Sequence, residues 1–371
     1  MAETYSPPPH YGEISAIELL PLVLRFLNLV TVKFAYKTVS YPFSGTHFTL
    51  RRVLWRTFVA TICPNSTFRQ MQWVLPNTGT LYLKFMKSLP DKPEIVQENL
   101  EVEGGSLHWI GPKSNKKVMI FVHGGGFVIP AVDGHFFMVD WWRREAKRRF
   151  DIDFSVAVLE YSLVTHAPWP IQLRQVVAAL QHLINQGYDP SDITVVGDSV
   201  GGHVVTFLLC HLLHPHPEAT PITLTKPLAG TAMLSPWLCY SIEAPSWKRN
   251  AAHDVMPLPA LLQWSGTFQK SRTRTDDGYY FEPATAPASW WTGIEKVTKD
   301  VLFATGDAEG MFDDIVATKD KIAQVAGKEM PLECFVQPKA AHNEALVEFA
   351  CGDKPGPTNE RMMAWIKNVY A

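Results

Sequence analysis

The chain has 371 residues, of which 46% are apolar and 19% charged, and its formal net charge is −2. This composition indicates a globular protein with a large core and excludes general disorder. Because 34 basic residues nearly balance 36 acidic ones, the chain lacks the positive field that nucleic-acid binding requires, and we expect no nucleic-acid partner.

The N-terminal quarter has helical apolar spacing. Residues 1–13 are polar and proline-rich and predict a loose arm, whereas 48–62 and 68–75 predict helices. Residues 14–36 are apolar, but polar residues or proline interrupt them at Glu18, Pro21, Arg25, Asn28 and Lys33. A membrane span needs about 20 nearly uninterrupted apolar residues. This stretch therefore predicts one or two amphipathic helices packed over the functional site, with contact to a membrane surface as the alternative.

Downstream of residue 90, short apolar runs alternate with helical patterns. Runs at 95–102 and 106–110 flank Gly104-Gly105 and predict a hairpin. Strands are then predicted at 117–122, 155–159, 193–196, 228–234, 301–305 and 332–336, and helices at 134–149, 171–186, 204–213, 312–326 and 358–370. This alternation predicts an α/β fold with a mostly parallel, doubly wound sheet.

Between about residues 236 and 291 the alternation stops and aromatic residues accumulate. The segment contains Trp237, Trp247, Trp264, Trp290 and Trp291. Such a density of aromatic residues away from the sheet is typical of a satellite core. We expect part of it to line a substrate pocket as an apolar lid, because pockets are lined mainly by apolar and aromatic side chains.

A glycine-flanked serine follows the strand at 193–196, in the sequence Gly197-Asp198-Ser199-Val200-Gly201. A strand that turns sharply into a helix needs small flanking residues. Its apical side chain, Ser199, then stands clear of the sheet, with the N–H of Val200 at the helix start. The motif alone is consistent with a nucleophile and equally with a plain glycine-rich turn.

A second glycine motif follows the strand at 117–122, in the sequence His123-Gly124-Gly125-Gly126-Phe127. Three glycines in a row let backbone N–H groups converge on one point, which suits the oxyanion of acyl transfer. A flexible loop is the alternative interpretation. Ser199 follows His123 by 76 residues, which fits one strand–helix–strand excursion between the two motifs.

With HGGGF followed by GDSVGG, the sequence resembles the hormone-sensitive-lipase branch of the α/β-hydrolase esterases, including its fungal steryl-acetyl-hydrolase-like members. The resemblance covers roughly residues 90–371. It implies the α/β-hydrolase fold with a helical cap. Residues 1–90 would then form an arm and cap helices, and residues 91–371 the catalytic core, with a cap insertion at about 236–291.

The resemblance also implies roles for the glycine-rich loop. The oxyanion hole would consist of the N–H groups of Gly125, Gly126 and Val200, and His123 would brace the loop. The family more often has alanine where this chain has Val200. Because only the N–H is needed there, valine is compatible with the role.

A serine hydroxyl needs a base, and the base needs an anion that orients it. In this fold the chain order is serine, acid, histidine. Most histidines beyond Ser199 lie on or near the following helix or in the 236–291 segment. His342 instead follows the last strand, where a loop would reach the serine, and we predict it to be the base.

Three acidic residues follow the strand at 301–305: Asp307, Glu309 and Asp313. The family register D-P-L-x-D, laid on Glu309–Asp313, places Glu309 in the catalytic position, and Asp307 remains the rival. We expect Asp313 to cap the next helix and Asp198 to buttress the turn at Ser199.

These residues predict a serine carboxylic-ester hydrolase that needs no metal or cofactor. Its expected substrate is a small-molecule ester with a short acyl group on a bulky apolar alcohol, such as an acetylated lipid or a product of secondary metabolism. An acyltransferase, lactonising cyclase or thioesterase could use the same triad. A non-catalytic small-molecule receptor is a further alternative, against which the presence of His342 weighs.

The five cysteines are scattered and contain no C-x-x-C pair, so neither a disulfide framework nor a thiolate metal site is predicted. The N-terminus lacks the basic–apolar–small layout of a secretory signal. We therefore expect an intracellular, cytoplasmic protein. No pattern indicates an oligomeric state.

Overall fold

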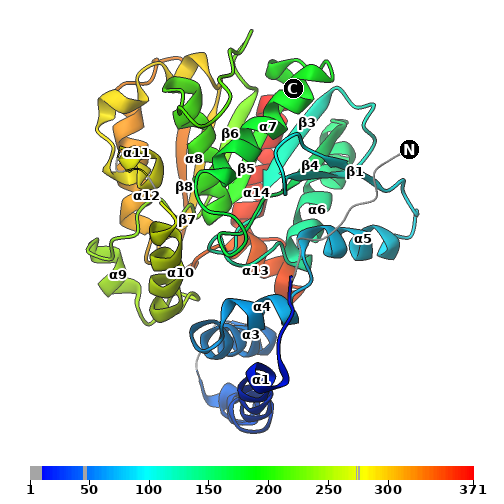
Figure 1. Ribbon diagram of the computed structural model, residues 1–371, viewed down its shortest axis with the longest axis vertical. Helices are drawn as coiled ribbons and strands as arrows, with labels where there is room; N and C mark the ends of the chain where they lie inside the picture. The colour runs from blue at the N-terminus through cyan, green and yellow to red at the C-terminus, as the bar shows by residue number, and fades with distance from the viewer. Residues whose placement is uncertain (1–10, 45–47, 273, 275) are drawn as a thin grey trace.

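The computed structural model describes residues 11–44, 48–272, 274 and 276–371, so most of the predicted arm at 1–13 lies outside the described residues. An eight-stranded sheet in the order β1-β2-β4-β3-β5-β6-β7-β8 forms the centre of the molecule (Figure 1). Its strands are β1 (Val96–Asn99), β2 (Ser106–Ile110), β3 (Lys117–Val122), β4 (Phe154–Glu160), β5 (Ile193–Asp198), β6 (Gly230–Leu234), β7 (Val301–Gly306) and β8 (Leu332–Gln337). Only β2 runs antiparallel to its neighbours, which confirms the mostly parallel sheet and the hairpin that opens it.

Helices cover both faces of the sheet, as a doubly wound topology requires. One core contains side chains of α5 (Thr78–Ser88), α6 (Asp133–Phe150) and α14 (Pro357–Tyr370). The other contains side chains of α7 (Ile171–Asn185), α8 (Val200–Leu213) and α12 (Phe312–Ala323). Strands β2 to β7 consist almost entirely of buried residues, since both of their faces are covered, whereas the edge strands β1 and β8 are mostly half-buried.

The order in which the chain adds strands to the sheet reverses at β3. From β3 the chain passes through α6 to β4 on one side, and then crosses through α7 to β5 on the other side. Val122, at the end of β3, pairs with Gly197, at the end of β5. The loops that follow these two strands therefore begin side by side, at the kind of topological switch point where α/β sheets bind ligands.

The structure differs from the predicted elements at several helix boundaries and in one additional helix. Helix α8 begins directly at Val200 and not four residues later. Helix α3 (Leu50–Ile62) starts two residues later than predicted because Thr49 caps it, its side chain accepting a bond from the N–H of Arg52. A short helix, α13 (Glu344–Cys351), was not predicted and follows His342 almost at once, between left-handed residues Asn343 and Gly352.

The N-terminal helices lie beyond the sheet. Helix α1 (Ala16–Asn28) runs through a π-helical stretch (Leu29–Phe34) into α2 (Ala35–Ser40), and Figure 1 shows α1 farther from the sheet than α3 and α4 (Phe68–Val74). The 236–291 segment forms α9 (Pro245–Asn250), α10 (Leu258–Lys270) and α11 (Gly278–Phe281).

Among the described residues, no helix combines the length and the apolar character that crossing a bilayer demands. All five cysteines are free thiols.

Candidate active site

Ser199 stands at the sharp turn between β5 and α8. Its backbone has φ 52° and ψ −121°, a conformation that L residues rarely adopt. The turn is this tight because α8 packs directly on β3: a Cβ added at Gly201 would collide with the carbonyl of Val122. Strain of this kind persists only where the surroundings enforce it, and here it presents the Ser199 hydroxyl at the carboxyl edge of the sheet.

Two hydrogen bonds connect Ser199 to a carboxylate. Nε2 of His342 lies 3.0 Å from Oγ of Ser199, and Nδ1 of His342 lies 2.8 Å from Oε2 of Glu309. All three side chains are buried, with exposed fractions of 8% for Ser199, 4% for His342 and 0% for Glu309. This is the arrangement in which an imidazole can take a proton from a hydroxyl while a carboxylate fixes its orientation.

The structure separates the three acidic candidates. Glu309 reaches His342, whereas Asp307 turns away and accepts a bond from the backbone N–H of Lys339 at 2.6 Å. The expected cap at Asp313 is wrong: this residue lies inside α12, which has no side-chain cap. Its carboxylate instead accepts the N–H of Ser246 at 2.7 Å and so ties α12 to α9.

An unpredicted acid, Asp254, links the loops that carry the base and its partner. Its carboxylate accepts the backbone N–H of Gly310 at 2.8 Å and that of His342 at 3.2 Å. Burial raises the pKa of Asp254. No sequence signal marks this residue, because it lies in an irregular segment far along the chain from both loops.

The pKa of His342 reflects opposing effects. Burial lowers it, but the hydrogen bond to Glu309 and the charges of Glu309, Asp254 and Asp198 outweigh burial, so the pKa stands above the usual 6.5. A base of raised pKa binds the serine proton more strongly, and it must itself be neutral to accept that proton.

The glycine-rich loop lies beside Ser199. Gly125 and Gly126 have φ of 124° and 62°, and a Cβ added at Gly126 would strike the indole of Trp264. Within the described part of the chain, no acceptor lies on the N–H of either glycine, whereas Gly124 donates to Oδ1 of Asp198 at 2.9 Å. Two free donors beside the N–H of Val200 at the start of α8 could bind an oxyanion.

Asp198 holds this loop in place, as the buttressing role requires. Besides the N–H of Gly124, its carboxylate accepts the side-chain N–H of Asn343 at 2.5 Å and lies 3.2 Å from Nε2 of His135. Burial raises the pKa of Asp198, but His135 and these donors outweigh burial and lower it. The carboxylate therefore stays charged and joins the glycine loop to the loop of His342.

His123 is also positioned as a brace. Its Nδ1 lies 2.7 Å from the carbonyl oxygen of Gly124, and its Nε2 lies 3.3 Å from Oγ1 of Thr78. Complete burial, with the nearby His135, lowers the pKa of His123 to about 3. The ring is therefore neutral at ordinary pH and contacts backbone rather than Ser199.

A cavity of about 350 Å³ opens over Ser199 and His342. Of the five tryptophans singled out between 236 and 291, Trp237 and Trp264 line the cavity, so part of this segment faces it. The opposite wall comes from α3, through Trp55, Phe58 and Val59. The apolar periodicity predicts that α3 is a helix but does not indicate which surface it covers. The sequence therefore does not identify these three residues as part of the pocket.

Four other histidines beyond Ser199 bond elsewhere. The ring nitrogens of His203, His211 and His214 face backbone carbonyl oxygens, and Nε2 of His216 lies 3.0 Å from Oδ1 of Asp277. Within the described residues no group of three His, Cys, Asp or Glu side chains is arranged to hold a metal ion.

Comparison with known proteins gives matches that share this architecture. Residues 119–344, more than half of the chain, match the family described as alpha/beta hydrolase fold. An esterase of Acinetobacter venetianus is 24% identical over 66% of this chain and 67% of its own length. Arylacetamide deacetylase of Oryctolagus cuniculus is 25% identical over 52% of this chain and 50% of its own, so the match spans half of that relative.

A solved structure has the same overall shape. The crystal structure of an esterase from the bacterial hormone-sensitive lipase family superposes with a TM-score of 0.63, covering 87% of this chain and 98% of that one. At 21% identity this likeness concerns the fold alone.

Proposed function

The chain belongs to the α/β-hydrolase fold family and is a carboxylic ester hydrolase, and we propose that it cleaves its ester through an acyl-enzyme on Ser199. The observation that carries the proposal is the pair of bonds from Ser199 to His342, 3.0 Å, and from His342 to Glu309, 2.8 Å. The three buried side chains provide a nucleophile, a base and an anion that orients the base, joined by consecutive hydrogen bonds.

In the acylation step, Oγ of Ser199 attacks the ester carbonyl carbon while Nε2 of His342 takes the hydroxyl proton. The carbonyl oxygen becomes an oxyanion, which the N–H groups of Gly125, Gly126 and Val200 stabilise. Glu309 stabilises the imidazolium without taking its proton. His342 then protonates the leaving alcohol, and the acyl group stays on Ser199.

Deacylation repeats these steps with water as the nucleophile. His342 takes a proton from the attacking water, the same donors hold the second oxyanion, and the proton returns to Ser199 as the acid leaves.

We propose a short acyl group on a bulky apolar alcohol as the substrate class. A cavity of about 350 Å³ lies at the low end of the range for ligand pockets, which favours a short acyl group, and its largely apolar and aromatic walls favour an apolar alcohol. Trp264 packs so closely on Gly126 that the space beside the oxyanion donors is narrow. The relative in Oryctolagus cuniculus is named a deacetylase, which is consistent with a short acyl group.

The test replaces Ser199 with alanine and measures turnover of p-nitrophenyl acetate. We expect Ser199→Ala to lower kcat by about 10⁴-fold or more, because the acyl-enzyme can no longer form. Turnover equal to that of the parent protein would refute the proposal. Product analysis with an added second alcohol then distinguishes transfer to water from transfer to another acceptor.

A further inference from the structure

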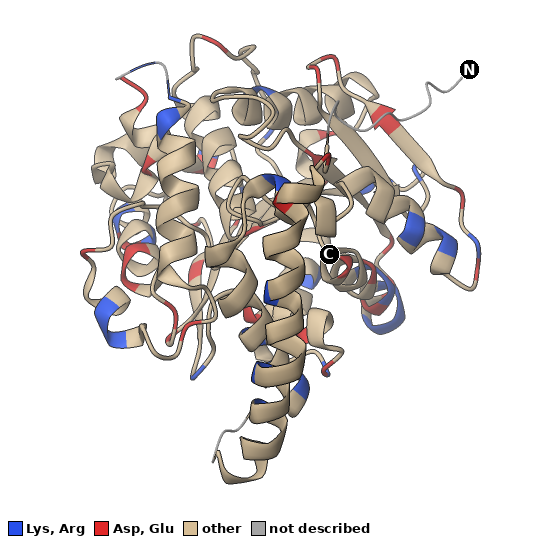
Figure 2. Cartoon of the chain, turned by 60° about the horizontal axis from the view of Figure 1, so that its bottom comes forward, with Lys and Arg blue, Asp and Glu red and all other residues tan. Residues whose placement is uncertain are grey.

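The helix formed by α1, the π-helical stretch and α2 is apolar yet almost wholly exposed. Between residues 14 and 44 only Leu22 and Leu29 are buried. Figure 2 shows the helix as a long, largely uncharged rod in the foreground. Its exposed large apolar side chains are Ile17, Leu20, Val23, Leu24, Leu27, Val30, Val32, Tyr36, Val39 and Phe43.

These side chains recur at helical spacing. Residues 17, 20, 24 and 27 follow one another every three or four positions, and 32, 36, 39 and 43 do so again from within the π-helical stretch onward. Phe43 is 87% exposed and Ile17 is 85% exposed, at opposite ends of the rod. An apolar stripe of this length on a protein surface marks a contact with another apolar body.

The helix itself is a well-built element. Ser15 and Glu18 form a reciprocal capping box at its start. Lys33 donates to Oγ1 of Thr61 on α3 at 2.9 Å, and Gln70 of α4 donates to the backbone of Glu18 at 2.5 Å. The exposed stripe is thus held in place from behind and is not the side of a frayed terminus.

The charges on this helix have one sign. From residue 19 to residue 44 the sequence contains Arg25, Lys33 and Lys37 and no acid, although the whole chain has a net charge of −2. Glu18, the one acid of the helix, is engaged in the capping box and lies 3.2 Å from a guanidinium nitrogen of Arg69. An apolar stripe with basic residues alongside is typical of helices that lie on a lipid surface.

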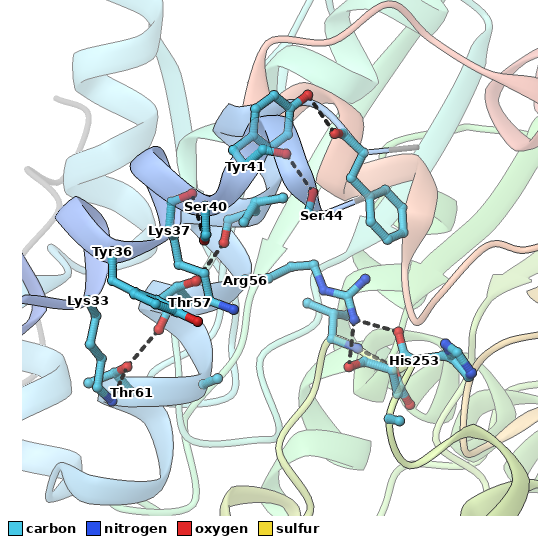
Figure 3. A pocket seen from close by; sticks show the side chains of 16 residues that line it. Lys33, Tyr36, Lys37, Ser40, Tyr41, Ser44, Arg56, Thr57, Thr61 and His253 are labelled. Atoms are coloured by element: carbon cyan, nitrogen blue, oxygen red, sulfur yellow. Dashed lines mark hydrogen bonds between the residues drawn. The ribbon is translucent and has the colours of Figure 1, made fainter. Parts of the chain in front are cut away.

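The basic groups gather around a second cavity. A space of about 830 Å³ is lined by the helix, α3 and the 252–255 segment, and Lys33, Lys37 and Arg56 stand around it (Figure 3). Arg56 donates to two backbone carbonyl oxygens, at 2.6 Å and 3.2 Å, and within the described residues no carboxylate lies within ion-pair distance of it. Asp254 is the one acid that lines this cavity.

We propose that this helix docks on an anionic lipid bilayer, with the apolar stripe at the acyl boundary and Lys37 near the lipid phosphates. A second copy of the chain fits the surface less well. A two-fold contact along the stripe would bring the same basic residues of both copies together, with no acid between residues 19 and 44 to pair them.

Docking would place the bilayer next to the catalytic pocket. The use of this arrangement for substrate delivery rests on the proposed esterase activity. Helix α3 binds the rod through Thr61 and lines the pocket through Trp55, Phe58 and Val59. An apolar ester dissolved in the bilayer would then reach Ser199 without crossing water.

Flotation of the full-length protein with lipid vesicles tests the proposal. The protein should float with vesicles of phosphatidylcholine and phosphatidylglycerol at about 3:1 and much less with phosphatidylcholine alone. Leu24→Glu, at a side chain that is 57% exposed, should lower the partition coefficient about tenfold or more. Lys37→Gln should lower it about fivefold.

Matched controls alter similar side chains elsewhere on the surface. Ile95→Glu places a charge at another exposed apolar residue, and Lys116→Gln removes a charge just before β3, at the edge of the sheet opposite Ser199. Both should float like the parent protein. All four variants should hydrolyse water-soluble p-nitrophenyl acetate at the parent rate, so lost docking is distinguishable from lost catalysis.

Three results would overturn the proposal: no flotation of the parent protein, equal flotation with neutral vesicles, or a Leu24→Glu variant that floats undiminished. A dimer in solution that Leu24→Glu dissociates, together with no flotation, would assign the stripe to a second copy of the chain.

Discussion

The carboxylate of Glu309 is held by more than its bond to His342. Its other oxygen, Oε1, accepts from Oγ of Ser235 and from the N–H of Gly306, each at 2.9 Å, and from the hydroxyl of Thr305. These donors come from the ends of β6 and β7, so the carboxylate is fixed by the sheet itself. A neutral replacement can keep this place while losing the charge that stabilises an imidazolium.

We predict that Glu309→Gln lowers kcat for p-nitrophenyl acetate by about 10⁴-fold with little change in KM, because the residue orients and stabilises the base without lining the pocket. Steady-state kinetics measures both parameters. Asp307→Asn is the matched control, since among the described residues the carboxylate of Asp307 accepts only the backbone N–H of Lys339, and this variant should retain the parent kcat. Equal losses in the two variants would contradict the assignment.

A second prediction concerns pH. His342 must be neutral to act, and its pKa lies above 6.5, so kcat/KM should fall as pH drops through a midpoint above 6.5. Glu309, Asp254 and Asp198 face the ring and favour its charged form. Removing the charge of Asp254 in Asp254→Asn should therefore move the midpoint to lower pH.

The pH profile of kcat/KM, measured for the parent, Asp254→Asn and Asp307→Asn, checks this prediction. Asp307→Asn should leave the midpoint in place. A midpoint that Asp254→Asn leaves unchanged or raises would mean that this carboxylate does not act on His342.

The site residues that the sequence predicts are those that belong to a motif or follow the end of a strand. Ser199 and the glycine loop follow from local composition, and Glu309 from a register that the resemblance provides. Asp254 has neither signal, because its contacts with the loops of Gly310 and His342 arise only when distant segments pack.

Two helices from distant parts of the chain form the pocket walls over the turn at Ser199. Helix α10 contributes Leu261 and Trp264, and α3 contributes Trp55 and Phe58. The alternation of strands and helices in the core was readable from the sequence because each element has its own period. Which face of α3 meets α10 depends on tertiary packing, and no periodicity encodes it.

We predict that Trp55→Ala lowers kcat/KM for an acetyl ester of a bulky alcohol, such as 1-naphthyl acetate, about tenfold more than for p-nitrophenyl acetate. The indole supplies apolar contact to the larger group, and contacts of this kind are worth about 1–3 kcal/mol. Trp73→Ala is the control, because Trp73 is 50% exposed on α4 and does not line the pocket. Equal losses on both substrates would show that α3 does not contact the alcohol.

The last helix, α14, packs into one of the two cores of the molecule. Trp365 of α14 is 1% exposed in the core that α6 shares, and its indole N–H donates to Oδ1 of Asp300 at 2.7 Å. The amphipathic pattern at 358–370 predicted this helix within one residue of its observed start. By contrast, the prediction that residues 14–36 pack over the functional site is wrong. None of them lines the cavity over Ser199, and most of their large apolar side chains are exposed.

Trp365→Ala should destabilise the folded protein by about 3–5 kcal/mol, because it leaves a large cavity and an unpaired Asp300. Denaturant titration measures this loss. Trp365 packs beside Gly230 and Asp300, at the amino ends of β6 and β7, whereas Ser199 lies at the carboxyl edge of the sheet. The kcat under folding conditions should therefore stay near the parent value. A loss below about 1 kcal/mol would contradict the described packing.

In the proposed mechanism, Ser199 is the residue that carries the acyl group. The most direct measurement is mass-spectrometric mapping of the protein after reaction with a fluorophosphonate. We predict a single adduct on the peptide that contains Ser199, absent from Ser199→Ala and strongly reduced in His342→Ala. An adduct on another residue, or equal labelling of the Ser199→Ala variant, would contradict it.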